Sequence, residues 1–326
     1  GASSSCPTPG ALPSTTTPVS IAGNGSELGS YVHSGVNGWG EWSMKYSSAS
    51  TPVEHDVVGV IDMSYGFDNQ CVATSTGVQC KGYQGGGLGD AANTINTSSY
   101  VTVDTLTSAI DVSVGSDFVC ALDGSGKPYC WGSNVKGRLG TGNNNTYVTP
   151  EASDTTTTFV SIESGAKHSC ALTSAGAMEC WGSNEEGQMA DTVWDGTSGT
   201  KSKKRPDTVY DLGSSTLFSK VSIGTESLFT AALIDNGSIA VWGEYNGTVN
   251  TDHFVLNSGV ATDVAAGTDH ICYLESGAVT CTGSNSAGQT TVPALTNPQS
   301  VFAGADWSCA GLNNGTYTCW GSKAGW

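Results

Sequence analysis

Short runs of alternating apolar and polar residues recur along the chain, and turn residues separate them in pairs. The segment from residue 120 to residue 130 is typical, because apolar residues alternate on both sides of the turn signal Asp-Gly-Ser-Gly. A period of two around a short glycine-containing turn predicts a β-hairpin. No helical period of 3.6 residues persists for long, so the pattern predicts an all-β protein.

The predicted hairpins belong to a longer repeat. A strand of the type Val-Ser-Ile leads into a glycine, and a second anchor, most often Trp-Gly, follows 15 to 18 residues later. The leading glycines are Gly23, Gly66, Gly115, Gly165, Gly224, Gly267 and Gly304. The second anchors begin at Trp39, Lys81, Trp131, Trp181, Trp242, Thr282 and Trp320. Seven repeats of 37 to 59 residues, each with several short strands, predict a seven-bladed β-propeller.

We divide the chain into an extended N-terminal arm, residues 1–18, rich in Pro, Ser and Thr, and a propeller over residues 19–326. The repeats start near residues 19, 60, 110, 160, 221, 262 and 300. Residues 10–23 resemble residues 292–304, which link the sixth repeat to the seventh. The arm is therefore expected to complete the last blade, either in its own ring or in a neighbouring subunit. A head-to-tail contact that does not close on itself would build a filament.

Ten of the eleven cysteines form local pairs separated by 9 or 10 residues. The pairs are Cys71 with Cys80, Cys120 with Cys130, Cys170 with Cys180, Cys272 with Cys281, and Cys309 with Cys319. Facing residues of a hairpin have Cα atoms ~4.5–5.5 Å apart, within the range that a disulfide accepts. The spacing predicts one disulfide-stapled hairpin in five of the seven blades. Zinc is disfavoured because no C-x₂₋₄-C motif occurs.

Two repeats lack the cysteine pair, and one cysteine is left over. We place Leu28 and Gly38 at the two cysteine positions of the first repeat, and Phe229 and Val241 at those of the fifth. Cys6 lies on the arm, and an odd cysteine in a secreted chain indicates either an intermolecular bond or a free thiol.

Composition narrows the class of protein. The chain has 12 basic and 29 acidic residues, a net charge of −17, which disfavours nucleic acids and anionic membrane surfaces as partners. No apolar run approaches the ~18 residues of a membrane span. Because the chain begins at Gly1 without a leader, we expect a mature protein whose secretion signal has been removed. Together with five disulfides, this predicts an extracellular or cell-surface location.

Sequence motifs also predict covalent glycans. Asn-x-Ser/Thr sequons occur at Asn24, Asn96, Asn144, Asn236, Asn246 and Asn314. The Pro-flanked residues Thr15, Thr16 and Thr17 resemble a short O-glycosylated stalk. Accidental sequons in a chain rich in Ser and Thr are the alternative.

Catalytic and metal-binding motifs were sought and not found. His168 and His270 occupy a repeat position that also holds Phe118 and Trp307, which indicates a packing role. The chain has no H-E-x-x-H, G-x-S-x-G, phosphate-loop or EF-hand motif. We therefore expect no enzyme activity, cofactor or metal. A His, Asp or Glu cluster in the central channel would restore the enzyme hypothesis, and the sequence indicates none.

The longest insertion, between the fourth and fifth repeats, is the best candidate for a partner-binding loop. It contains an aromatic residue and four of the twelve basic residues: Trp194, Lys201, Lys203, Lys204 and Arg205. Insertions and exposed aromatic residues often carry binding, and an acidic neighbouring subunit would suit the basic patch. A solvated loop is the alternative.

The segments that start at Cys120 and Cys170 and run through Cys-Trp-Gly-Ser-Asn resemble regulator-of-chromosome-condensation repeats. The resemblance covers essentially the whole chain and implies a seven-bladed propeller. Members of the family act in guanine-nucleotide exchange, chromatin binding and protein inhibition. The predicted disulfides and the −17 charge contradict the first two roles, and we carry over no functional residue.

The sequence therefore favours a non-enzymatic extracellular structural protein that self-associates through its N-terminal arm in a surface or fibre-like assembly. The alternative is a secreted binding or inhibitor module that recognises a protein or glycan through loops on one propeller face.

Overall fold

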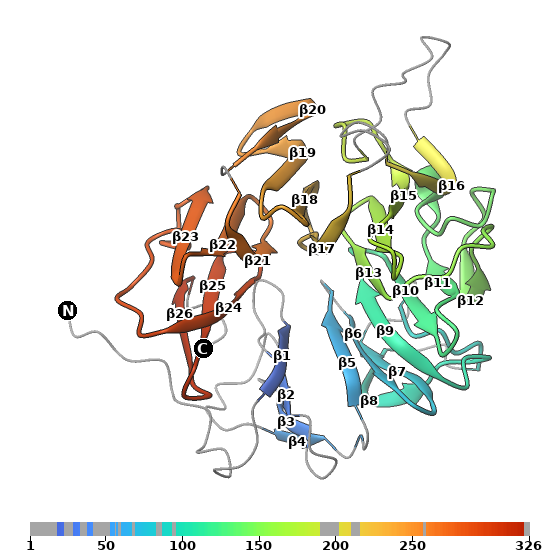
Figure 1. The fold of residues 1–326 in the computed structure, drawn as a ribbon. Helices are drawn as coiled ribbons and strands as arrows, with labels where there is room; N and C mark the ends of the chain where they lie inside the picture. Colours follow the sequence, from blue (N-terminus) through green and yellow to red (C-terminus); the bar gives the residue numbers. More distant parts are fainter. Residues whose placement is uncertain are drawn as a thin grey trace.

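The computed structural model describes residues 18–22, 29–32, 38–41, 53–55, 57, 60–66, 69–82, 87–92, 96–189, 202–209, 216–256 and 259–322. These residues form β-strands, together with the short 3-10 turn η1 (Val135–Gly137). The strands form eight antiparallel sheets, of which β1–β2 and β3–β4 together make the first blade, so that seven blades lie around a common axis, as predicted for a propeller (Figure 1). Within this described part, no helix has the length and apolarity needed to cross a membrane.

Blades two to five are antiparallel sheets of four strands each. Blade two contains β5 (Val60–Tyr65), β6 (Asn69–Thr74), β7 (Gly77–Gly82) and β8 (Thr97–Thr102), and blade three contains β9 (Ala109–Val114), β10 (Phe118–Asp123), β11 (Pro128–Gly132) and β12 (Tyr147–Ala152). Blade four contains β13 (Ser161–Ser164), β14 (His168–Leu172), β15 (Met178–Ser183) and β16 (Ser202–Thr208), and blade five contains β17 (Phe218–Ser222), β18 (Leu228–Ile234), β19 (Ile239–Tyr245) and β20 (Thr248–Val255).

Blades six and seven have three strands each in the described part of the chain. They are β21 (Ala261–Ala266), β22 (His270–Glu275) and β23 (Ala278–Gly283), then β24 (Pro298–Ala303), β25 (Trp307–Leu312) and β26 (Tyr317–Gly321). The connection from β23 to β24, residues 284–297, forms no strand. The outer edges of β23 and β26 therefore have no paired strand among the described residues.

The first blade lies between the seventh and the second. It comprises β1 (Pro18–Ala22) paired with β2 (Gly29–Val32), and β3 (Gly38–Glu41) paired with β4 (Val53–His55). β1 contacts both β5 and β24, which closes the ring of blades. Most of the predicted arm, residues 1–17, lies outside the described residues, and so does Cys6.

The core lies between blades. Trp131, Trp181 and Trp242 of the Trp-Gly anchors are fully buried, and each packs against the preceding blade. Trp131 also donates its indole N–H to the carbonyl of Gly87 at 3.1 Å. In blade two, Lys81 takes the place of the tryptophan and is 1% exposed, with its ammonium 5.0 Å from the ring centre of Tyr100.

All five predicted hairpin disulfides are present, and each joins directly opposed residues of the second and third strands. Their Cα atoms lie 4.0–4.2 Å apart. In blade five, Ala231 rather than Phe229 is opposite Val241, so the assignment of Phe229 to a cysteine position was wrong. Phe229 lies opposite Gly243, as Phe118 lies opposite Gly132, because blade five has two additional residues after its leading glycine.

Candidate functional site

The innermost strands carry a repeated polar position four residues before the leading glycine. The residues there are Asp62, Asp111, Ser161, Lys220, Asp263 and Ser300 in blades two to seven. A β-bulge immediately precedes the position in every one of these blades except blade four. Bulges redirect side chains, and here the same device recurs around the ring. We call the polar side chains of the innermost strands the axial wall.

Side chains of the axial wall bind the backbone of the next blade. Asp62 accepts a hydrogen bond from the amide of Val112 at 3.1 Å, and Asp111 accepts one from Ile162 at 2.8 Å. Two residues further along, Ser64 and Ser113 similarly accept the amides of Val114 and Ser164, at 2.9 and 2.8 Å. These N–H groups lie on the free inner edge of a sheet, where an unpaired donor costs stability and invites unwanted pairing. The axial wall therefore joins neighbouring blades and covers their inner edges.

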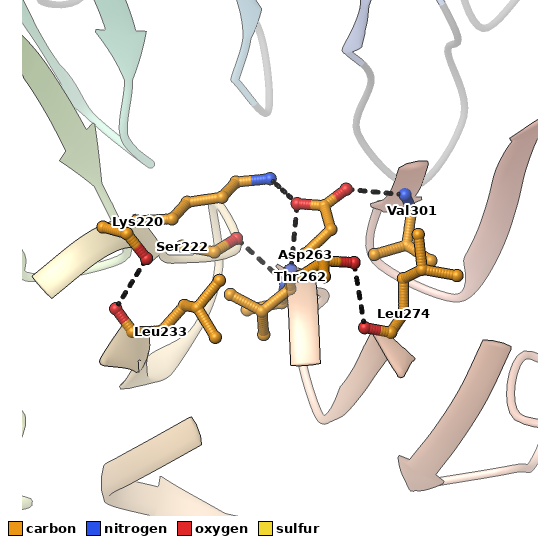
Figure 2. Close-up of polar contacts among 10 residues, drawn as sticks. Lys220, Ser222, Leu233, Thr262, Asp263, Leu274 and Val301 are labelled. Carbon is orange, nitrogen blue, oxygen red and sulfur yellow. Dashed lines mark hydrogen bonds and ion pairs between the residues drawn. The ribbon is translucent and has the colours of Figure 1, made fainter. Parts of the chain in front are cut away.

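The wall has two electrostatically different halves. In blades five to seven, the Lys220 ammonium lies 2.6 Å from one oxygen of Asp263, while the other oxygen accepts the amide of Val301 at 2.8 Å (Figure 2). The amide of Ala266 donates to the hydroxyl of Ser222 at 3.0 Å. In this half of the wall, the charges of Lys220 and Asp263 form an ion pair.

In blades two to four the carboxyl groups of the wall form no ion pair among the described contacts, although the charge of Lys220 acts to lower the pKa of Glu163. Asp62 and Asp111 lie on the inner strands of adjacent blades, Glu163 lies on the next inner strand, and all three side chains are half-buried. Burial raises the pKa of Asp62, and burial together with the Asp62 charge raises the pKa of Asp111 well above its usual range. Burial raises the pKa of Glu163 to about 8. We call Asp62, Asp111 and Glu163 the acid cluster.

Blade five closes the axis at one end. Its two additional residues extend the turn, and Thr225 donates its hydroxyl to the carbonyl of Tyr65 in blade two at 2.9 Å. Ser116 of blade three donates to the carbonyl of Thr225 at 3.2 Å. Ser227 accepts the amide of Ala166 from blade four at 3.1 Å. One turn therefore ties four blades together across the axis.

This arrangement joins neighbouring blades through hydrogen bonds from backbone amides to side chains. Among the described residues, no group of three or more His, Cys, Asp or Glu side chains has the geometry of a metal site. The carboxylates of Asp62, Asp111 and Asp263 are each committed to a backbone amide of the next blade.

The two histidines predicted to pack are completely buried. His168 Nε2 lies 2.8 Å from the Thr230 hydroxyl, and His270 Nε2 lies 2.8 Å from the Ser308 hydroxyl, each in the following blade. Burial lowers the pKa of His168 to about 3 and that of His270 to about 4, so both rings are neutral near pH 7.

The basic cluster is a strand, not a loop as its composition suggested. Lys203, Lys204 and Arg205 lie on β16, which pairs with β15 as the outermost strand of blade four. Lys203 forms an ion pair with Asp207 at 2.7 Å, and Arg205 forms one with Asp154 of blade three. Lys204 and Arg205 are exposed. The other members of the predicted partner loop, Trp194 and Lys201, lie outside the described residues.

Every sequon asparagine within the described residues is exposed. These are Asn96, Asn144, Asn236, Asn246 and Asn314. Asn24, Thr15, Thr16 and Thr17 lie outside the described part of the chain.

The acid cluster was missed from the sequence. A signal was present, because aspartate recurs four residues before the leading glycine in Asp62, Asp111 and Asp263. Strand periodicity alone could not find it, because a polar residue alternating with apolar ones is expected to face solvent. Only the ring closure brings carboxyl groups that are about 50 residues apart in sequence next to one another.

The fold and the inter-blade packing define a disulfide-stapled seven-bladed β-propeller. Sequence models of the regulator of chromosome condensation (RCC1) repeat match residues 125–172, and residues 109–138 and 159–188, in blades three and four. Blades three and four therefore contain repeats similar to the RCC1 repeat. No curated protein sequence matches it.

Solved structures share the fold at low sequence identity. Human WBSCR16 is 16% identical with a TM-score of 0.73, covering 96% of this chain and 89% of its own. Prp20p from Saccharomyces cerevisiae, whose structure was described with its binding to Gsp1p and histones, is 17% identical with a TM-score of 0.68, covering 93% and 82%. The ectodomain of the Physcomitrella patens receptor kinase CR4 is 18% identical with a TM-score of 0.59, covering 94% and 74%.

Proposed function

We propose that this protein is a non-enzymatic extracellular propeller that assembles with copies of itself, with its N-terminal arm as the joining strand. The observation that carries the proposal is that blade seven has three strands among the described residues, so the outer side of β26 is where a fourth strand would pair. Blades two to five cover the same edge of their third strand with a fourth strand. A strand supplied by another chain can pair with a sheet at this position.

The arm has the sequence of a fourth strand. Residues 8–22 align without a gap with residues 149–163, and nine of the fifteen aligned positions are identical. Residues 147–152 form β12, the outer strand of blade three, and Pro150 is buried there. The corresponding Thr8-Pro9 pair suits the outer edge of a blade. In an assembly, this strand would come from a neighbouring copy.

The disulfides and the exposed sequons support an extracellular location. Five disulfides are typical of an oxidising compartment, and the exposed sequons are accessible to glycosylation. A receptor-kinase ectodomain shares the fold. We therefore propose a secreted or surface-bound glycoprotein.

The test is the mass of the oxidised protein by light scattering over a range of concentrations. We expect particles well above the monomer mass of 33.2 kDa. Removing residues 1–17 is expected to give monomers, whereas Cys6→Ser tests separately whether a disulfide locks the joint. A monomeric intact protein would overturn the assembly proposal and leave the arm to complete its own ring.

If the intact protein is monomeric, a secreted binding module is the better candidate function. The exposed Lys204 and Arg205 on the outermost strand of an otherwise acidic protein favour an anionic protein or glycan as partner. A glycan array probed with the intact protein and with a double variant, Lys204→Glu and Arg205→Glu, would test that function. Equal binding by both proteins would exclude the β16 surface.

A further inference from the structure

We propose that N-linked glycans at Asn96, Asn144 and Asn246 protect the outer edges of blades two, three and five from pairing with other copies of the chain. This inference rests on the glycoprotein proposed above and gives its glycans a role in directing assembly. Each of the three asparagines lies at most three residues before the outermost strand of its blade, β8, β12 or β20. All three residues are exposed.

The three sequons share one position in the blade, the connection between the third and the fourth strand. These two strands are antiparallel in each blade, so the connection lies at the same end every time. The hydroxyl residue of the sequon belongs to the outer strand at Ser98 and Thr248 and immediately precedes it at Thr146. A glycan attached here is therefore next to the first residues of the outer strand. The sequon of Asn236 differs, because it lies in the turn between the second and third strands of blade five, at the opposite end.

The outer strands that follow these sequons are edges on which pairing with another chain is favourable. No further strand pairs with the outer side of β8, β12 or β20 among the described residues. The strand β8 contains no charged residue. On β12 and β20, Val148, Val249 and Val255 are 49–58% exposed. Uncharged or apolar edge strands are sites of pairing between chains, and a bulky, hydrophilic glycan at the end of such a strand hinders the approach of a second chain.

Blade four has a different form of protection. Residues 184–201, which lead to its outer strand β16, contain no sequon. The strand itself contains Lys203, Lys204, Arg205 and Pro206. Lysine and proline on an edge strand discourage pairing with another chain. By contrast, β12 and β20 have one acidic residue each and no basic side chain other than a histidine in β20. The sequons therefore accompany the outer strands that have few charges of their own.

Blade six has neither form of protection. Residues 284–297, which follow β23, contain no sequon, and β23 contains no charged residue. In blade seven, the sequon of Asn314 lies in the turn between β25 and β26 and not in a connection that leads to a fourth strand. Protection of the outer edge is therefore confined to four consecutive blades, two to five. The remaining edges are left for joining copies of the chain.

The test destroys the three sequons without changing the asparagines. The triple variant Ser98→Ala, Thr146→Ala and Thr248→Ala lacks the acceptor motif, whereas Ser98→Thr, Thr146→Ser and Thr248→Ser preserve it. The full-length proteins are produced in a host that attaches N-glycans, and peptide mass spectrometry measures the occupancy of each asparagine. Light scattering then gives the particle mass relative to the monomer mass. We expect the alanine variant to form particles at least about twice as large as the wild type, because pairing of two edges joins two particles.

Two controls separate edge protection from other effects. The sequon-preserving variant should match the wild type, and so should Ser238→Ala, which removes only the sequon of Asn236 in the turn of blade five. Enzymatic removal of the glycans from folded wild-type protein should give the same larger particles without any substitution. Unoccupied edge sequons in the wild type, an unchanged particle mass in the alanine variant, or an equal increase in Ser238→Ala would overturn the edge protection.

The outcome also separates this inference from the proposed assembly through the arm. A wild type that is monomeric, together with an alanine variant that associates, would support edge protection and overturn the assembly. Wild-type particles that are larger than a monomer and do not grow in the alanine variant would support the assembly and overturn edge protection. Amide hydrogen exchange locates the new contact, because protection should rise in β8, β12 and β20 of the alanine variant.

Discussion

Blades four and seven share the same three-strand plan and the same hairpin disulfide, but among the described residues only blade four has a fourth strand. In blade four, β16 covers β15, and Cys180 and Trp181 are at most 1% exposed. In blade seven, β26 is partly exposed along its whole length, and this includes Cys319 and Trp320. The difference shows that the repeat sequence builds the hairpin, while burial of its outer face depends on the additional strand.

The same contrast extends to the neighbouring blades. The third strands of blades two to five are largely buried, whereas β23 of blade six alternates between exposed and partly exposed residues. Blades six and seven therefore form one continuous region of incompletely covered strands. Such a region either binds a partner or is the least stable part of the ring.

The largest expected effect on the unfolding free energy is the difference between replacing Trp181 and replacing Trp320. Trp181→Ala removes a fully buried indole that packs between blades three and four, and should cost about 3–5 kcal/mol of unfolding free energy. Trp320→Ala removes a partly exposed indole whose N–H donates to the Gln289 carbonyl at 2.8 Å, and should cost clearly less. Urea unfolding of both variants measures the difference. Equal losses would mean that blade seven is as well packed as blade four.

The second prediction concerns the acid cluster, which lies in the covered half of the ring. The folded-state pKa of Glu163 is about 8, against 4.5 for an ordinary glutamate. The protonated form is therefore favoured in the fold, and its contribution is complete below pH about 4.5 and lost as pH rises to about 8. Glu163→Gln should remove this loss, on the order of 2–4 kcal/mol at pH 8.

The measurement is the difference in unfolding free energy between Glu163→Gln and the wild type at pH 5 and pH 8. Asp263→Asn is the control from the other half of the axial wall, because it breaks an ion pair with Lys220. That control should be less stable than the wild type at both pH values. A Glu163→Gln effect that is equal at both pH values would contradict the prediction.

The third prediction compares the disulfides. Cys281 and Cys319 are partly exposed, whereas both cysteines of the pairs in blades two, three and four are at most 1% exposed. A mild reductant should therefore open the bonds of blades six and seven first, and alkylation followed by mass spectrometry identifies them. Replacing the Cys309–Cys319 pair with alanines should cost roughly 2–3 kcal/mol by the chain-entropy argument. Reduction of all five bonds at one rate would indicate global unfolding instead.

Hairpins and disulfide partners were predictable because they depend on contacts within about ten residues. The Cys120–Cys130 pair, for example, follows from period two and one turn. The same local reasoning misplaced Phe229, because the two additional residues of blade five change the offset from the glycine without changing the hairpin. Counting back from the Trp-Gly anchor would have found Ala231.

Features that depend on blade-to-blade contact were not predictable in this way. Asp62 and Asp111 meet only because consecutive blades lie side by side, and the cross-axis bond from Thr225 to Tyr65 spans 160 residues. The strand β16 was read as a loop because it lacks alternating apolar residues. An outer strand needs none, since backbone pairing with β15 holds it in place.

The smallest expected effect on stability comes from placing a lysine on β23. The outer edge of this strand has no fourth strand among the described residues, so the same variant tests whether the edge takes part in assembly. Thr280 is exposed on β23, so Thr280→Lys should change the unfolding free energy by less than about 0.5 kcal/mol. A charge on an edge strand discourages pairing with another chain, so the same variant should lower the mass of any assembly that uses blade six. Thr316→Lys, in the exposed hairpin turn of blade seven, is the matched control. If both variants leave the particle mass unchanged, the edge of blade six takes no part in the contact, and the joint between copies is confined to β26.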